Sequence, residues 1–223
     1  MKKFRMSLLL VLSAAMLLGG CSTWNKTQKG AVIGTAAGGA AGAVIGKTAG
    51  NTALGAIIGA AVGGGAGAII GRQMDKQAEE IKKNVPDAKV DRIGEGIVVE
   101  FSSNVLFAFD DSDLSDDAKM NLGKLVSVLE TYPETNIEVQ GHTDSKGSVA
   151  YNQNLSEQRA SVASRYLTNS GISPSRLNIV GFGESLPKYA NDSSEGRTQN
   201  RRVEFLITAN EKMKAEAEEA ASN

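Results

Sequence analysis

The chain has 223 residues, which is enough for one medium-sized domain and an additional N-terminal region. Its 24 basic and 25 acidic side chains leave a formal net charge of −1, which excludes the strongly positive surface of a nucleic-acid-binding protein. The single cysteine, Cys21, excludes an internal disulfide.

The first twenty residues have the pattern of an export signal. Basic residues stand near the start, and the apolar run 6–18 that follows is too short to span a bilayer comfortably. The run leads into Leu-Gly-Gly-Cys, which ends at Cys21. This ending resembles the lipobox of bacterial lipoproteins, and the resemblance implies a signal peptide at residues 1–20 and a lipidated N-terminus at residues 21–29. An ordinary signal peptide with a chance cysteine is the alternative.

A lipidated Cys21 would hold the chain on a membrane. One acyl chain binds only marginally, at about 0.8 kcal/mol per buried methylene, but several chains together make a stable anchor. Ser22 follows at the position where the sorting rules of such lipoproteins place Asp for retention in the inner membrane. The resemblance therefore implies a lipid-anchored protein of the outer membrane whose domain faces the periplasm.

Glycine is concentrated in an internal repeat at residues 30–71. It recurs at every fourth position, at 30, 34, 38, 42 and 46 and again at 55, 59, 63, 67 and 71. A period of four places these glycines on one helical face, where another backbone can approach closely. Such helices are unfavourable in water, since each glycine costs up to about 1 kcal/mol relative to alanine, but in lipid a helix is the only local way to pair the backbone.

The two glycine blocks resemble the glycine-zipper membrane-domain family, and we expect a helical hairpin inserted in the membrane or lying against it. A flexible Gly/Ala spacer is the alternative, although a spacer has no need of a period of four. Residues 72–89 follow as a charged, helix-compatible run that ends at Asn84 and Pro86. We interpret this run as a solvated linker.

Strands and helices alternate from residue 90 onward. A β-branched run predicts a strand at 97–101, and a second extended stretch is expected at 105–110. Ser115 is a suitable N-cap for a helix that Pro133 stops. The further predicted elements are a strand at 136–140, a helix at 148–170 that buries Leu155, Val162, Ala163 and Tyr166, a third core strand at 177–182, a last strand at 202–208 and an exposed, fraying helix at 210–223. This alternation predicts helices covering one sheet.

Three short motifs lie within this region. They are Gly141-His142-Thr143-Asp144, Asn152-x-x-Leu155-Ser156-x-x-Arg159-Ala160 and Asn200-Arg201-Arg202-Val203-Glu204. Together they closely resemble the OmpA-like peptidoglycan-binding domain, here over residues 90–209. The resemblance implies an α+β or α/β fold of the OmpA C-terminal type, a βαβαβ sandwich with helices packed on a mixed sheet, preceded by the glycine-zipper hairpin.

The motifs pair a loop carboxylate, Asp144, with a helical guanidinium, Arg159. Two opposite charges suit a zwitterionic ligand, and a guanidinium can bond both oxygens of a carboxylate at once. The resemblance assigns Asp144 to the ammonium and Arg159 to the carboxylate of diaminopimelate in peptidoglycan. The further candidate contacts are Asn152, Thr143, Ser112 and Arg201. A structural ion pair between Asp144 and Arg159 is the alternative.

No catalytic or metal site is expected. His142 is the only histidine and has no second histidine or cysteine ligand near it, and no nucleophile motif is present. We therefore expect a protein without cofactor or enzyme activity that tethers the outer membrane to peptidoglycan. The alternative is that the glycine blocks drive a homo-oligomeric membrane scaffold or pore, with the C-terminal domain as its wall anchor.

Overall fold

The computed structural model describes residues 64–107 and 113–222, and it is built around one mixed sheet. The strands are β1 (Lys89–Ile93), β2 (Gly96–Ser102), β3 (Thr135–His142), β4 (Leu177–Gly181) and β5 (Arg202–Ala209). They lie in the order β1-β2-β5-β3-β4. Neighbouring strands are antiparallel except β3 and β4, which are parallel.

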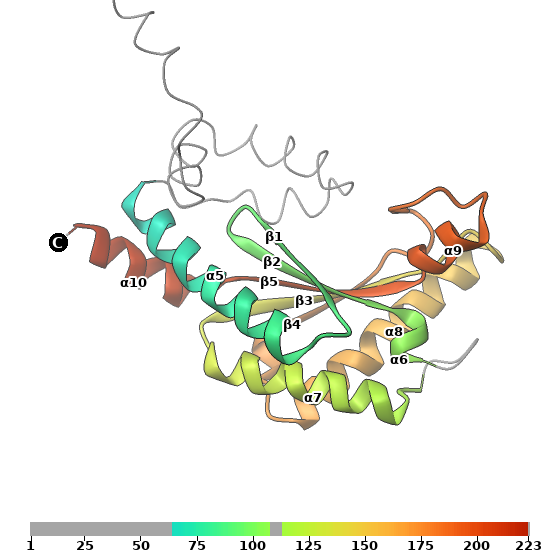
Figure 1. Ribbon diagram of the computed structural model, residues 1–223, viewed down its shortest axis with the longest axis horizontal. Coiled ribbons are helices and arrows are strands. Elements are labelled where there is room, and N and C mark those ends of the chain that lie inside the picture. The colour runs from blue at the N-terminus through green and yellow to red at the C-terminus, as the bar shows by residue number, and fades with distance from the viewer. Residues whose placement is uncertain (1–63, 108–112, 223) are drawn as a thin grey trace, which may run out of the picture.

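Helices pack on one face and at both ends of this sheet (Figure 1). They are α5 (Gly65–Asn84), α6 (Ser103–Leu106), α7 (Asp116–Thr131), α8 (Val149–Asn169), the short 3-10 turn η1 (Pro174–Arg176), α9 (Ser194–Asn200) and α10 (Glu211–Ser222). Helix α8 is part of the crossover that two parallel strands such as β3 and β4 require. A mixed sheet with packed helices confirms the predicted fold class.

The sheet face toward the helices carries the hydrophobic core. Val99, Val139 and Phe205 occupy this face on β2, β3 and β5, and each is fully buried. Phe101 and Phe205 meet edge to face, with 5.8 Å between ring centroids. The period-two alternation of strand side chains separates this core from a small second cluster around Val98 and Leu206 on the other face.

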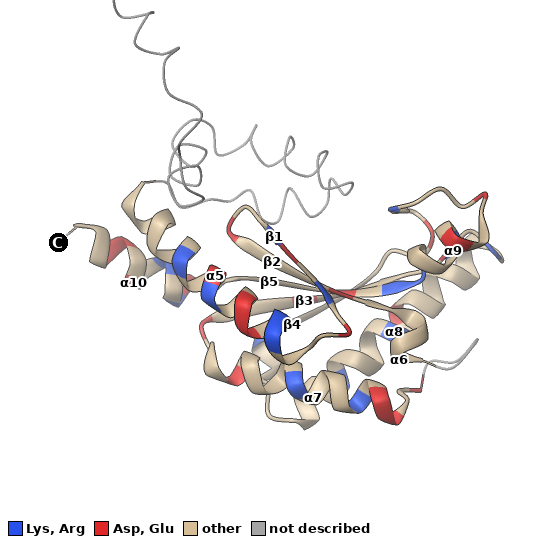
Figure 2. Ribbon diagram, viewed as in Figure 1, with Lys and Arg blue, Asp and Glu red and all other residues tan. Residues whose placement is uncertain are grey.

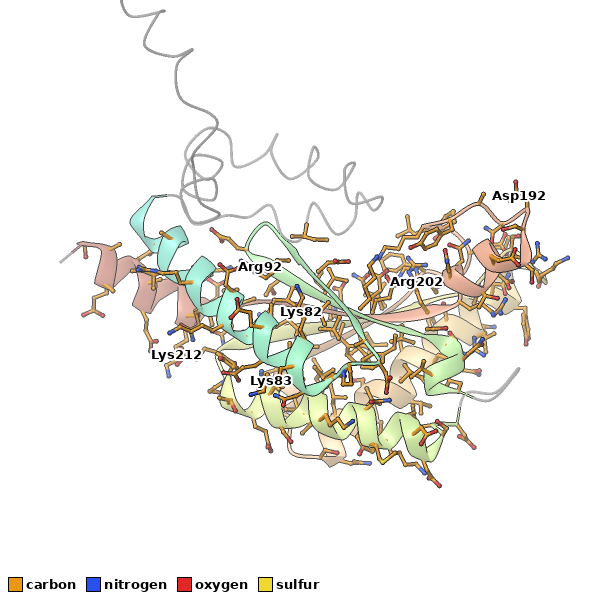
Figure 3. The ribbon with its side chains drawn as sticks, in the orientation of Figure 1. Lys82, Lys83, Arg92, Asp192, Arg202 and Lys212 are labelled. Carbon is orange, nitrogen blue, oxygen red and sulfur yellow. The ribbon has the colours of Figure 1, made fainter. Side chains whose placement is uncertain are left out.

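Helix α5 is not the solvated linker that its charges suggested. One continuous helix crosses the expected boundary between the glycine repeat and the charged run at residues 72–89. Ile70, Met74 and Ile81 form its buried side and are 0% exposed. The charges lie on its other side, where Lys82 and Lys83 are exposed (Figures 2 and 3). The apolar residues recur at helical spacing, so the helix is amphipathic and packs on the domain.

The C-terminal segment is helical as expected, but it is packed rather than exposed and fraying. Helix α10 lies beside α5 (Figure 1) and buries Met213 and Ala217 in the same core. A Cβ atom on Gly65 would stand 3.0 Å from the Cβ of Ala221, so the two helices are in close contact. The packed unit therefore runs from residue 65 to residue 222, rather than from 90 to 209.

Most of the glycine repeat, like the signal sequence and Cys21, lies outside the described residues. Only residues 64–71 of the repeat are described, and from Gly65 onward they form the first turns of α5. Within residues 64–107 and 113–222, no helix is long and apolar enough to cross a membrane.

Two predicted strands need correction. Residues 103–106 form a helical turn, because the Ser103 N–H donates to the Arg201 carbonyl and the Phe107 N–H donates back to the Ser103 carbonyl. Phe107 makes an isolated bridge to Leu114, and residues 108–112 lie outside the described part of the chain. Strand β4 exists, but it is an edge strand with Ile179 44% exposed rather than a core strand. Strand β1 and helix α9 were not predicted.

Helix α8 touches the sheet at a pair of glycines. Gly141 of β3 and Gly181 of β4 are register partners. A Cβ atom on Gly141 would lie 2.0 Å from the carbonyl oxygen of Ser156, and one on Gly181 would lie 2.6 Å from its Oγ atom. The Ser156 hydroxyl also accepts a hydrogen bond of 2.9 Å from the Gly183 N–H. The strands have no side chain at this point, so the backbone and the Ser156 side chain of α8 lie directly on the two glycines.

This close approach changes which side of α8 is buried. Small side chains dominate the sheet-facing side: Ser156, Ala160, Ala163 and Ser164. Ala163 was predicted correctly, whereas Leu155, Val162 and Tyr166 are only partly buried. A large side chain does not fit where the α8 backbone rests on glycine, so Leu155, Val162 and Tyr166 are only partly buried, whereas Leu167, farther along the helix, is fully buried in the core.

Gly141→Ala is expected to destabilise the domain, because a methyl group does not fit 2.0 Å from a carbonyl oxygen and α8 must move. Overpacking of this kind costs about 1–3 kcal/mol. Urea unfolding of the full chain in detergent measures it. Gly71→Ala is the matched control, because nothing lies within 4 Å of its Cβ position in α5. That variant is expected to gain up to about 1 kcal/mol of helix stability, and equal stability of the two variants would contradict the close approach.

Ile70→Ala tests whether α5 belongs to the core. The side chain is 0% exposed, and removing such a group costs about 2–5 kcal/mol. Arg72→Ala, an exposed neighbour on the same helix, is expected to change the unfolding free energy by no more than about 0.5 kcal/mol. The same urea titration serves both variants. If both variants unfold at the same urea concentration, α5 does not belong to the core and is a solvated linker.

Candidate functional site

A pocket of about 240 Å³ opens beyond the carboxyl end of β3. Residues from four places in the sequence line it: the start of α6, the loop after β3, the first half of α8 and the last turn of α9. It contains five of the residues predicted from the sequence motifs: Thr143, Asp144, Asn152, Arg159 and Arg201. Ser112, the remaining predicted pocket residue, lies outside the described residues.

Asp144 is held from two sides. Its Oδ1 atom accepts a hydrogen bond of 2.8 Å from the Lys146 backbone N–H, and its Oδ2 atom lies 2.6 Å from Nη1 of Arg201. The residue is only 6% exposed, so its carboxylate is less accessible than the turn-forming sequence around it suggests. A carboxylate has about four lone-pair sites, so these two contacts leave acceptor capacity for a ligand.

Arg159 extends from α8 and is 4% exposed. Its guanidinium carbon lies 5.3 Å from the centre of the Phe107 ring, which is a cation–π contact. Asp144 forms an ion pair with Arg201. The sequence had offered Arg159 as the structural partner of Asp144.

Asn152 lies on the same side of α8 as Arg159, because positions i and i+7 are two turns apart. Its Nδ2 group donates to the Glu184 carboxylate, which holds the amide in one orientation. The Ser148 hydroxyl caps the N-terminus of this helix by accepting from the Tyr151 N–H at 3.2 Å. The cap and the Ser156 contact together fix the first half of α8 against the sheet.

Two hydroxyl groups in the pocket wall have no hydrogen-bond partner among the described residues. They belong to Ser103 and Thr143, which are 2% and 4% exposed. Leaving a buried hydroxyl unpaired costs about 1–3 kcal/mol, so each is an available partner for a polar ligand or an ordered water. Ser103 was missed from the sequence, where no motif distinguishes it from other serines.

Two further cations line the pocket, Lys146 and Arg197, and neither was predicted from the sequence. Lys146 follows Asp144 by two residues in the same loop. Arg197 lies in α9, four residues before Arg201, which follows the end of that helix, and its Nη1 atom donates to the Asn191 carbonyl at 2.8 Å. The i, i+4 spacing of the two arginines was a usable signal, but only if α9 had been recognised as a helix.

Arg201 and Arg202 are adjacent but have different surroundings. Arg201 lines the pocket, whereas Arg202 is 1% exposed and forms a 2.6 Å ion pair with Glu204 (Figure 3). Lys188 lies 3.3 Å from the same carboxylate. Burial raises the pKa of Glu204, but the positive charges of Arg202 and Lys188 outweigh burial and hold that pKa below its ordinary value. The pair therefore anchors the start of β5 while Arg201 contributes to the pocket.

His142 lies beside this buried ion pair. Burial, with a contribution from positive Arg202, lowers the pKa of His142 to about 3, so the ring is neutral at physiological pH. The ring stacks on Phe182, with 5.3 Å between ring centroids. In the described part of the chain, no group of three or more His, Cys, Asp or Glu side chains is placed to hold a metal ion. His142 is thus a core residue.

Comparison with known proteins divides the chain into two matched regions. The model of the OmpA family matches residues 106–201, and the YMGG-like Gly-zipper model matches residues 1–75. The chain is 33% identical to the Probable lipoprotein YiaD of Escherichia coli (strain K12), over 93% of this chain and 99% of that protein. It is 35% identical to the Peptidoglycan-associated lipoprotein of Legionella pneumophila, over 47% of this chain and 59% of that protein.

Other similarities are confined to the C-terminal part. Outer membrane porin F of Pseudomonas fluorescens is 43% identical over 50% of this chain, and the chain spans only 34% of that porin's length. Among solved structures, a MotB-like protein from Desulfovibrio vulgaris superposes with a TM-score of 0.59 at 28% identity, over 63% of this chain and 93% of that one. Because the OmpA match contains the pocket's charged residues and the similarity to the E. coli lipoprotein runs along nearly the whole chain, the chain belongs to the OmpA family and carries a glycine-zipper region ahead of its OmpA-like domain.

Proposed function

We propose that this pocket binds peptidoglycan non-covalently and so tethers the outer membrane to the cell wall. The single observation that carries the proposal is that one pocket holds a buried carboxylate, Asp144, and a buried guanidinium, Arg159. The free end of diaminopimelate presents an ammonium and a carboxylate on one carbon atom. The printed name of the Legionella relative, a peptidoglycan-associated lipoprotein, supports the same ligand.

In the proposed complex the ligand ammonium donates to Asp144 and the ligand carboxylate accepts from Arg159. Arg201 keeps the Asp144 carboxylate oriented through their ion pair. Asn152 and the unpaired hydroxyl of Thr143 supply neutral hydrogen bonds, and Ser112 is proposed as a further contact from the loop outside the described residues. These groups bind and orient a ligand, and the proposal includes no catalytic step.

The location is also proposed. Relatives named as outer membrane porins and lipoproteins support a place in the bacterial envelope. We propose that Cys21 carries the lipid anchor in the outer membrane and that the domain faces the periplasm. Binding to one stem peptide is expected to be weak, but an anchored domain beside a polymeric wall meets a high effective concentration of sites.

Asp144→Ala and Arg159→Ala are each expected to weaken binding to purified peptidoglycan sacculi by about tenfold or more. Each removes a charge-assisted contact that contributes about 1.5–3 kcal/mol. Sedimentation of the full chain in detergent with sacculi measures the bound fraction, and circular dichroism checks that each variant remains folded. Arg165→Ala, an exposed arginine of the same helix, is the matched control and is expected to bind as wild type does.

Arg159→Lys extends this experiment. Lysine keeps the positive charge but lacks the planar fork that bonds both carboxylate oxygens, so we expect binding between that of wild type and Arg159→Ala. If the alanine variants of Asp144 and Arg159 sediment with sacculi as wild type does, the pocket is not the binding site.

A second function is favoured by the Gly-zipper match over residues 1–75. We propose that the repeat associates copies of the chain into a membrane scaffold or pore that the OmpA-like domain anchors to the wall. A chain lacking residues 30–63 is expected to lose cross-linked oligomers and keep sacculus binding. The deletion stops at 63 because Ile70 is part of the domain core. Oligomers that survive the deletion would exclude the repeat as the association surface.

A further inference from the structure

The charges that line the pocket do not balance. Within its described lining there is one carboxylate, Asp144, and there are four cations: Lys146, Arg159, Arg197 and Arg201. The ion pair with Asp144 accounts for Arg201. In the proposed function Arg159 meets the carboxylate of the zwitterionic end. Lys146 and Arg197 remain as positive charges without an assigned ligand group.

Neither of these two cations is neutralised within the described part of the chain. Lys146 is exposed and its ammonium makes no ion pair there. Arg197 is half-buried and uses one of its five donors on a neutral acceptor, the Asn191 carbonyl. The other donors of the Arg197 guanidinium are therefore available to a ligand carboxylate in the pocket.

The connectivity places both cations next to the Asp144–Arg201 ion pair. The Lys146 backbone N–H donates to the Asp144 carboxylate, and Lys146 lies two residues after Asp144 in the same loop. Arg197 precedes Arg201 by one helical turn, and the Arg201 N–H donates to the Arg197 carbonyl at 3.1 Å. The pocket lining thus has one further cation from the loop after β3 and one from α9, in addition to Arg159 and Arg201.

We propose that Lys146 and Arg197 form a second subsite of this pocket that binds another carboxylate of the same stem peptide. This inference rests on the proposed function. A tripeptide stem offers two such groups: the α-carboxylate of D-glutamate, which is linked through its γ-carboxyl group, and the backbone carboxylate of its terminal diaminopimelate. The pocket therefore selects stem peptides whose carboxylates are free over those in which they are amidated.

The test compares three tripeptides by calorimetry with the full chain in detergent. One is L-Ala-γ-D-Glu-diaminopimelate with all carboxylates free, the second is amidated at the D-Glu α-carboxyl group, and the third at the backbone carboxyl group of diaminopimelate. Wild type is expected to bind one of the amides about threefold to fivefold more weakly than the free peptide, as suits a partly exposed ion pair. The amide that is weakened identifies the carboxylate that is bound.

Lys146→Gln is expected to bind the free peptide as weakly as that amide, so that the preference disappears, and Lys146→Arg is expected to retain it. Lys83→Gln, which removes an exposed lysine of α5 (Figure 3), controls for a general loss of positive charge and keeps the preference. Lys146 is varied because Arg197 also holds the Asn191 carbonyl. A preference that persists in Lys146→Gln overturns the subsite.

The outcomes also separate this inference from the function on which it rests. Wild type that binds all three peptides equally overturns the second subsite and leaves the wall-binding pocket in place. Wild type that binds none of them, while Asp144→Ala sediments with sacculi as wild type does, overturns both.

Discussion

The contact of α8 with two glycines fixes the geometry of the pocket. Ser156 rests directly on Gly141 and Gly181, which have no side chains of their own. Asn152 lies one turn before Ser156, and Arg159 lies nearly one turn after it, so the same contact sets both side chains against the pocket. Gly141 is three residues before Asp144 on the other side of that contact. This steric contact therefore helps to place the carboxylate and the guanidinium in the lining of one pocket.

Local features of the domain could be predicted because they depend on near neighbours in the sequence. Ser115 caps α7 by accepting from the Ala118 N–H, and Gly171 follows α8 at a φ of 108° that only glycine adopts without strain. The core strands follow the period-two pattern of their β-branched residues. The charges of the site, Asp144 and Arg159, could be predicted through the OmpA-like motifs that contain them.

Features that depend on distant segments could not be predicted in this way. From the sequence, α5 and α10 were each predicted to be charged and solvated. Each helix buries only a few apolar residues, and these are covered only when the two helices pack together. The buried side of α8 was predicted to carry large apolar residues, because nothing in the helix sequence shows that this side packs on glycines of β3 and β4. In the pocket, Ser103 and Arg197 are ordinary polar residues until α6 and α9 place them beside Asp144.

The packing of α5 has a consequence for the proposed tether. The elements that line the pocket, α6 and α9, lie at one end of the sheet, whereas α10 and the start of α5 lie at the other (Figure 1). If Cys21 is lipidated and the pocket binds a wall peptide, as proposed, a pull between them enters the domain at the start of α5 and leaves it at the pocket, at the other end of the sheet. Because Ile70 and Met74 of α5 are buried in the core, this force is transmitted through α5 to the folded domain. The resistance of the tether then depends on the α5–α10 contact as much as on the affinity of the pocket.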